Sequence, residues 1–99
     1  MNFDQLRQHA VQLRKIAQSH GISQIYVFGS VARGETTPSS DVDFLVDMQE
    51  GGLLFGVAGF GYESEKLLGI RVDVVPSVTL PQIKDRKFVA TVQKEAILL

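Results

Sequence analysis

The stretch FGSVARGETTPSSDVDFLVD, residues 28–47, decides how this 99-residue chain folds. The β-branched and aromatic run at 25–28 predicts a strand that stops at Gly29-Ser30. The next residues, 30–33, have the composition of a short helical turn. A strand that passes through a glycine into a helical turn exposes backbone N–H groups that can bind an anion.

Two acidic residues share one face of the strand that follows. A polar loop at 35–40 leads into residues 41–47, whose composition predicts this second strand. Because side chains alternate along a strand, Asp41 and Asp43 lie on one face with their Cα atoms ~6.6 Å apart. Asp47 shares that face but is expected to be a turn residue. The apolar residues of the opposite face are expected in the core, and these are Val42, Phe44 and Val46.

The segments around this stretch alternate between helix and strand. Apolar residues at three- and four-residue spacing predict an amphipathic helix over 2–20, which Gly21 ends. A third strand is expected at 71–75, and capping-box spacing predicts a last helix from Thr79 towards the C-terminus. The order αβ(α)βαβα predicts an α/β fold of two layers, in which helices pack against a small mixed sheet of three or more strands.

The helix expected over 53–68 contains unusually many glycines. Gly56, Gly59 and Gly61 each disfavour a helix interior by roughly 1 kcal/mol relative to alanine. We therefore expect a helix that frays or breaks early and that ends at Gly69.

A third carboxylate joins the two on the second strand. Asp73 is flanked by two valines that are expected in the core, so it faces the other way. If its strand lies beside residues 41–47, the three acids converge on one patch. Carboxylates this close repel each other unless a cation lies between them, and oxygen-only ligands suit Mg²⁺ or Mn²⁺. Two-metal nucleotidyl transfer requires such an arrangement, whereas the structural alternative is a solvated strand face that resists aggregation.

The start of the helical turn offers groups that bind phosphate. Gly29 allows the backbone to approach a phosphate closely, and Ser30 adds a hydroxyl to the exposed N–H groups. The dipeptide alone would also fit a simple strand-ending turn. Arg33 either binds phosphate or pairs with an acid such as Glu35 or Asp41.

Composition narrows the classes of function. The chain has no cysteine, which excludes disulfide scaffolds, thiolate metal sites and cysteine nucleophiles. Ten Lys and Arg against eleven Asp and Glu give a net charge of −1, so direct nucleic-acid binding is not expected. The longest apolar run, 53–61, is far below the ~20 residues of a membrane span, and the first residues lack a signal-peptide pattern. We expect one cytoplasmic domain over 1–99.

The pattern Gly-Ser-x-Ala-Arg-Gly-x₆-Asp-x-Asp at 29–43, followed by Asp73, resembles the signature of the polymerase-β-type nucleotidyltransferase superfamily. It is most similar to the minimal nucleotidyltransferases, single domains of about this length, and the likeness extends over nearly the whole chain. The resemblance implies the two-layer core of that superfamily, ATP as substrate and two Mg²⁺ ions, with Mn²⁺ as the alternative. The implied catalytic and metal-binding residues are Asp41, Asp43 and Asp73. The implied nucleotide-binding residues are Gly29, Ser30 and, secondarily, Arg33.

The same resemblance implies a partner and a reaction. Minimal nucleotidyltransferases typically accompany a HEPN-domain protein, often a ribonuclease toxin. They act as antitoxins of type VII toxin–antitoxin pairs by transferring AMP from ATP to a tyrosine of that partner. Two alternatives stay open. One is an antitoxin that neutralises its partner by binding alone, and the other is a nucleotidyltransferase for a small molecule, which usually carries an extra helical domain for the acceptor.

Overall fold

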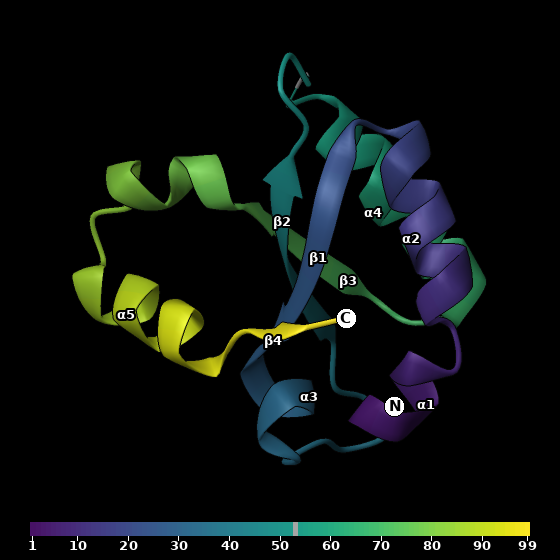
Figure 1. Ribbon diagram of the computed structural model, residues 1–99. Coiled ribbons are helices and arrows are strands. Elements are labelled where there is room, and N and C mark those ends of the chain that lie inside the picture. The colour runs from purple at the N-terminus through teal and green to yellow at the C-terminus, as the bar shows by residue number, and fades with distance from the viewer. Residues whose placement is uncertain (53) are drawn as a thin grey trace.

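A four-stranded mixed sheet forms the centre of the computed structural model, which describes residues 1–52 and 54–99. Its strands are β1 Ile22–Phe28, β2 Val42–Met48, β3 Val72–Pro76 and β4 Ile97–Leu98. They lie in the order β3-β2-β1-β4 (Figure 1). β1 is antiparallel to both β2 and β4, while β2 and β3 are parallel. The predicted α/β class and the mixed sheet of at least three strands are confirmed.

Helices lie on both faces of this sheet. They are α1 Phe3–Arg7, α2 Ala10–Ser19, α3 Gly29–Arg33, α4 Gly56–Leu68, the 3₁₀ helix η1 Ser77–Gln82 and α5 Arg86–Glu95. The larger layer contains α2 and α4, whereas η1 and α5 cover part of the other face (Figure 1). Among the described residues, no helix is long and apolar enough to cross a membrane.

The alternation of β2 places its apolar side chains in the larger core. Val42, Phe44 and Val46 are fully buried, as predicted. The Phe44 ring packs on Phe60 of α4 with the ring centroids 5.6 Å apart, and burying one such side chain contributes about 1.5–3 kcal/mol. A second cluster holds η1 and α5 against the opposite face, and its buried members are Phe28, Leu45, Leu80, Val89 and Val92.

α4 is the crossover that makes β2 and β3 parallel neighbours. It begins at Gly56, after a turn at 54–55, and runs unbroken through Gly59 and Gly61, so these two glycines do not break it as predicted. Gly69, with a φ of 71°, confirms the predicted C-terminal cap. Residue 53, where the predicted helix begins, lies outside the described residues.

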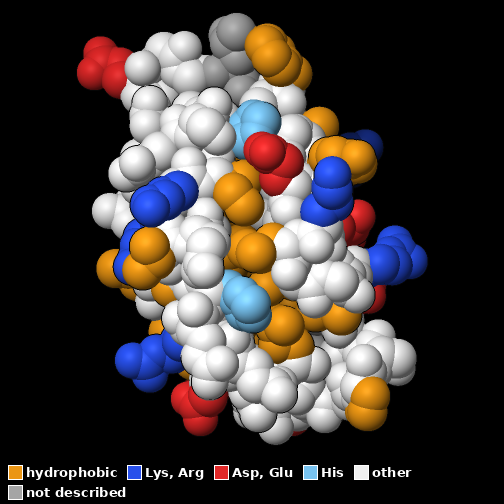
Figure 2. Space-filling model, turned by 90° about the vertical axis from the view of Figure 1, so that its right-hand side faces the viewer, with side chains coloured by type: hydrophobic (Ala, Val, Ile, Leu, Met, Phe, Trp, Pro, Cys, Tyr) orange, Lys and Arg blue, Asp and Glu red, His pale blue; other side chains and the backbone are white. Residues whose placement is uncertain are grey.

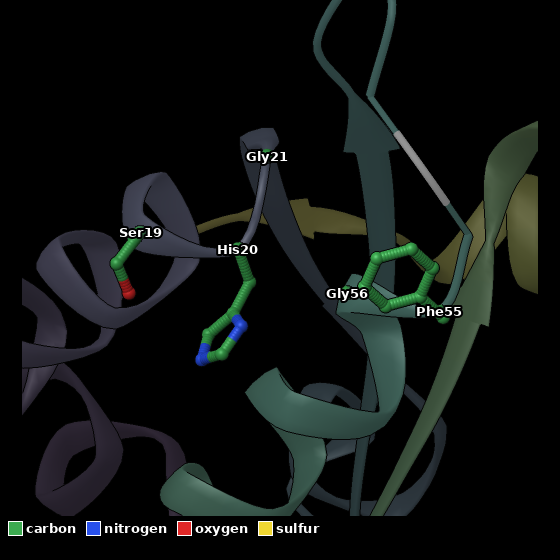
Figure 3. A pocket seen from close by; sticks show the side chains of 5 residues that line it. All are labelled: Ser19, His20, Gly21, Phe55 and Gly56. Carbon is green, nitrogen blue, oxygen red and sulfur yellow. The ribbon is translucent and has the colours of Figure 1, made fainter.

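Two of the α4 glycines make room for the end of α2. A Cβ at Gly56 would collide with the carbonyl oxygen of His20, and a Cβ at Gly59 would collide with its imidazole. His20 projects towards the start of α4 beside a hollow that Phe55 and Gly56 also line (Figure 3), and its ring pairs with Glu63. On this face, hydrophobic side chains gather along the middle with both histidines among them (Figure 2). The glycines therefore serve the packing of two helices.

The predicted single helix over 2–20 is two helices. α1 ends at Arg7 and α2 begins at Ala10, because the His9 N–H bonds to the Leu6 carbonyl at 2.9 Å and forms a tighter turn. The apolar spacing nevertheless runs unbroken through this turn, and its buried residues are Leu6, Ala10, Leu13 and Ala17. The spacing predicts the buried face and does not detect the break.

The predicted C-terminal helix is shorter at both ends. The Thr79 hydroxyl donates to the Pro76 carbonyl at 2.7 Å within η1 instead of capping an α-helix. The N-cap is Asp85, whose side chain accepts from the Phe88 N–H. Residues 97–98 form β4 rather than helix because they pair with the edge of β1, where strand N–H and C=O groups would otherwise lack partners.

Candidate active site

The turn between β1 and α3 requires glycine for two reasons. Gly29 has a φ of 75°, a left-handed conformation that disfavours residues with a Cβ. A Cβ at this position would also collide with Oδ2 of Asp43. The turn therefore lies directly against the Asp43 carboxylate, and Ser30 follows as the second residue of α3.

The three predicted acids lie near one another at one end of the sheet. Parallel pairing makes Asp43 the register partner of Asp73, and Asp41 stands one residue before β2. Burial, followed by the negative charges of Asp73 and Asp41, raises the pKa of Asp43 to about 6. A hydrogen bond with Asp73 raises the same pKa, whereas the positive charge of Arg33 lowers it.

These carboxylates suit a divalent cation that also binds phosphate oxygens. Within residues 1–52 and 54–99, no group of three or more acidic, histidine or cysteine side chains encloses a metal ion by itself. Asp43 and Asp73 form a pair of oxygen donors, and Mg²⁺ is commonly held by one or two carboxylates with waters and substrate phosphates. The repulsion that raises the Asp43 pKa is of the kind that a cation relieves. The donor set therefore fits Mg²⁺ or Mn²⁺.

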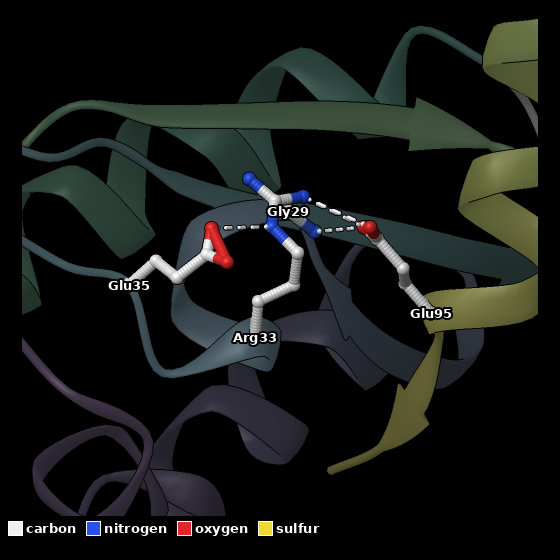
Figure 4. A network of polar contacts seen from close by, with 4 residues as sticks. All are labelled: Gly29, Arg33, Glu35 and Glu95. Atoms are coloured by element: carbon white, nitrogen blue, oxygen red, sulfur yellow. Dashed lines mark hydrogen bonds and ion pairs between the residues drawn. The ribbon is translucent and has the colours of Figure 1, made fainter.

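Arg33 is held by two carboxylates (Figure 4). Its Nε donates to Glu35 at 3.1 Å, and its Nη1 donates to both oxygens of Glu95 at 2.9 and 3.0 Å. The predicted alternative of an ion pair with Glu35 is thus present. The hydrogen bond to Glu95 raises the pKa of Arg33 most, and the hydrogen bond to Glu35 raises it further. Arg33 also lowers the pKa of Asp43, so the Arg33 guanidinium lies at the border of the acidic patch, the group formed by Asp41, Asp43 and Asp73.

Sequence reasoning missed Glu95. This residue ends α5, and its Oε2 accepts a hydrogen bond from the Gly29 N–H at 3.1 Å, although the two residues are 66 positions apart. The side chain is only 17% exposed. The one signal in the sequence is an acid in the last turn of a helix, where the macrodipole favours basic residues. An unfavourable charge at that place indicates a partner elsewhere in the fold.

Asp47 lies within β2 and is not the turn residue that the sequence predicts. Its carboxylate accepts a hydrogen bond from the Ser77 hydroxyl at 2.5 Å, and its charge, more than burial, raises the pKa of Tyr26. It lies four positions along the strand from Asp43. Asp47 therefore stabilises the other end of the sheet and is not part of the acidic patch.

Comparison with known proteins shows the family to which this chain belongs. A family model described as a nucleotidyltransferase domain matches residues 10–99. A relative from Methanocaldococcus jannaschii, named "Putative protein adenylyltransferase MJ0435", is 36% identical over 87 residues, which are 87% of this chain and 90% of the relative. The chain belongs to the nucleotidyltransferase family. It is an enzyme of the class that transfers nucleotidyl groups.

Further relatives of this nucleotidyltransferase agree with the assignment. Protein adenylyltransferase MntA from Thermococcus cleftensis is 41% identical over 67 residues, which are 68% of each chain. A solved "putative minimal nucleotidyltransferase" is 37% identical, with a TM-score of 0.79 over 100% of this chain and 97% of the other. A toxin–antitoxin complex with AMP-PNP has the same fold, with a TM-score of 0.68 at 19% identity over 89% of this chain and 69% of the other. The predicted resemblance to minimal nucleotidyltransferases is confirmed.

Proposed function

We propose that this nucleotidyltransferase moves AMP from ATP to a hydroxyl group of a partner protein. The observation that carries the proposal is the placement of the Asp43–Asp73 pair directly against the Gly29 turn. Acids that bind metal and a turn that binds phosphate are the two halves of such a site. A protein as acceptor is supported by the relatives at 36% and 41% identity that are named protein adenylyltransferases.

In this proposal the turn between β1 and α3 binds the β- and γ-phosphates. Gly29 lets the backbone approach them, and the Ser30 hydroxyl donates a hydrogen bond. Arg33 supplies a guanidinium, whose charge-assisted hydrogen bonds to phosphate are stronger than those of neutral donors.

We also propose that Asp41, Asp43 and Asp73 hold the Mg²⁺ ions of the reaction, with Mn²⁺ as the alternative. When bound, such ions neutralise phosphate charge and promote ionisation of the attacking hydroxyl. Asp73 is more exposed than Asp43, so it is the carboxylate that an acceptor would reach first. Its role is to orient that hydroxyl and to accept its proton.

The proposed step conserves atoms and charge. The hydroxyl oxygen of the acceptor forms a bond to the α-phosphorus of ATP, and the bond from that phosphorus to the bridging oxygen of the β-phosphate breaks. Pyrophosphate leaves with the electron pair of the broken bond, and the hydroxyl proton passes to the Asp73 carboxylate. The products are the AMP ester of the acceptor and pyrophosphate.

The acceptor that we propose is a tyrosine of a HEPN-type toxin, in the cytoplasm where ATP is available. The chain would then be the antitoxin of a type VII pair, acting as one domain over 1–99. A solved MntA–HpeT toxin–antitoxin structure supports this with its shared fold, at a TM-score of 0.66 and 20% identity over 91% of this chain and 70% of the other.

The test is transfer of label from α-labelled ATP to the partner. The double variant Asp41→Asn with Asp43→Asn should lose transfer by at least roughly a hundredfold, because it removes both charges beside the phosphate turn. Asp47→Asn is the matched control, since it removes an acid of the same strand that is bound to Ser77. Transfer by the double variant at the wild-type rate would refute the proposed site.

The same variant separates transfer from inhibition by binding. If the double variant still silences the toxin without labelling it, the antitoxin acts by complex formation. If the wild-type protein labels a small acceptor and does not label the partner, the enzyme modifies small molecules instead.

A further inference from the structure

Glu95 presents a carboxylate to the donors that a triphosphate would use. One of its oxygens accepts from the Gly29 N–H at 3.1 Å, and both accept from Nη1 of Arg33 at 2.9 and 3.0 Å (Figure 4). The Glu95 side chain is 17% exposed and its bond to Gly29 is partly buried, whereas Arg33 is 41% exposed, so its two bonds to Glu95 are more open to water. A carboxylate and a phosphate offer the same chemistry here, namely anionic oxygens that accept from N–H and guanidinium groups.

We propose that Glu95 competes with the nucleotide for this turn and thereby sets the affinity of the enzyme for ATP. This rests on the proposed function, because it takes Gly29 and Arg33 as donors to the triphosphate. Two anions cannot occupy the same donors, and like charges a few ångströms apart repel each other. The carboxylate must therefore leave before the phosphates bind.

Glu35 allows Arg33 to keep its position when Glu95 leaves. It accepts from Nε, whereas Glu95 accepts from Nη1, so the two acids hold different edges of the guanidinium. Glu35 is 64% exposed, which leaves it hydrated and weakly competing with a phosphate. The departure of Glu95 thus frees one guanidinium nitrogen and the Gly29 N–H without releasing the arginine.

The body of α5 need not move for this exchange. Val89 and Val92 anchor the helix in the smaller core, and the Ala96 N–H bonds to the Val92 carbonyl at 3.0 Å. Rotation of the Glu95 side chain is sufficient to vacate the donors. The competition therefore resides in one side chain, which makes it accessible to a single substitution.

This competition distinguishes nucleotides by their phosphates. ATP carries the β- and γ-phosphates that need the turn, whereas AMP lacks them and does not displace Glu95. Glu95→Gln removes the charge and one of the two acceptor oxygens while keeping the size of the side chain. It should therefore strengthen the binding of ATP and leave the binding of AMP unchanged.

The experiment is calorimetric titration of ATP and of AMP, with Mg²⁺, into the wild type, Glu95→Gln and Glu35→Gln. We expect the Kd for ATP to fall about tenfold in Glu95→Gln, the lower end of what one hydrogen bond to a charged group contributes. The Kd for AMP should not change. Glu35→Gln is the matched control, because it also removes a carboxylate from Arg33 but leaves the Gly29 N–H occupied, and it should not strengthen ATP binding.

Three results would overturn the inference. One is an unchanged or weaker affinity of Glu95→Gln for ATP, which would leave the proposed function intact. Another is that Glu95→Gln strengthens AMP binding as much as ATP binding, or that Glu35→Gln strengthens ATP binding equally. Either outcome would indicate a general effect of charge. The third is the absence of ATP binding in both the wild type and Glu95→Gln, which would contradict the proposed function as well.

Discussion

Gly29 combines a backbone requirement with a steric one. Its left-handed φ of 75° is shared by Gly34, at 74°, on the other side of α3. The surroundings differ, because a Cβ at Gly29 meets the Asp43 carboxylate whereas a Cβ at Gly34 meets nothing within 4 Å. The two glycines thus form a matched pair in which only one touches the acidic patch.

Gly34→Ala should lower the free energy of unfolding by ~1 kcal/mol, the strain of a left-handed alanine. Gly29→Ala should lower it by at least as much, because its Cβ also meets the Asp43 carboxylate. Only Gly29→Ala should also displace Asp43, so it should reduce nucleotidyl transfer at least roughly tenfold, while Gly34→Ala retains transfer. Urea unfolding and the α-labelled ATP assay measure the two effects. Equal transfer by both variants would show that contact between Gly29 and Asp43 is irrelevant to the site.

Asp43 makes the metal-free protein sensitive to pH. Its pKa of about 6 lies above the 3.8 of an ordinary aspartate. The folded state therefore holds the proton more tightly than the unfolded chain, and stability falls as the pH rises through this window. The stability that protonation contributes is fully present below pH ~4 and lost above pH ~6.

Asp43→Asn should stabilise the metal-free protein by about 1 kcal/mol at pH 7, a figure that allows for solvent screening of a half-buried group. The gain should shrink as the pH falls through 6 and vanish below pH ~3, where the wild-type carboxyl is protonated in both states. Urea unfolding in the presence of a chelator measures it, with the exposed acid substitution Glu50→Gln as control. If Asp43→Asn is no more stable than the wild type at pH 7, the carboxylates of Asp41 and Asp73 do not repel Asp43 as described.

At the residue scale, spacing predicts local chemistry and misses long-range partners. Asp41 and Asp43 were predictable because strand alternation places them on one face. Glu95 was not, since its contact with Gly29 depends on where α5 docks, and no local pattern encodes that position.

At the scale of elements, the glycines of α4 show how packing overrides helix propensity. Propensity alone predicts that any of them destabilises the helix. Gly56 lies against the backbone carbonyl of His20, which cannot move aside, whereas a Cβ on Gly61 would only touch Val74 at an ordinary 3.6 Å. Two positions in the same helix should therefore respond to alanine with opposite signs.

Gly61→Ala should stabilise the protein by about 0.5–1 kcal/mol through helix propensity. Gly56→Ala should destabilise it by roughly 2 kcal/mol, because overpacking forces α2 and α4 apart. Thermal or urea unfolding of the two single variants is the measurement. Stabilisation by Gly56→Ala would mean that α4 does not pack on the end of α2 as described.

The elements were predictable where one strong local signal decides them. The β-branched runs of the first three strands and the stop at Gly69 are such signals. The turn at His9 and the two residues of β4 are not, because a single backbone hydrogen bond forms the first and an open sheet edge recruits the second.

At the scale of the whole molecule, a mixed sheet gathers residues from four separate parts of the chain. The three acids can converge only if β3 lies beside β2, and no pattern in the sequence predicts that neighbour. The parallel pairing of Asp43 with Asp73 meets this requirement. The end of α5 then closes on the turn at Gly29. The acids and the proposed phosphate-binding turn meet because the topology, and not any local motif, sets their distance.

The most direct measurement of the central claim is the intact mass of the proposed toxin partner, co-expressed with this chain and incubated with ATP and Mg²⁺. With the wild-type nucleotidyltransferase, the partner should gain mass in units of AMP. With Asp41→Asn and Asp43→Asn combined, the complex should still form while the partner mass stays unchanged. A partner that gains no AMP from the wild type, or that gains it equally from the double variant, would contradict the proposed reaction.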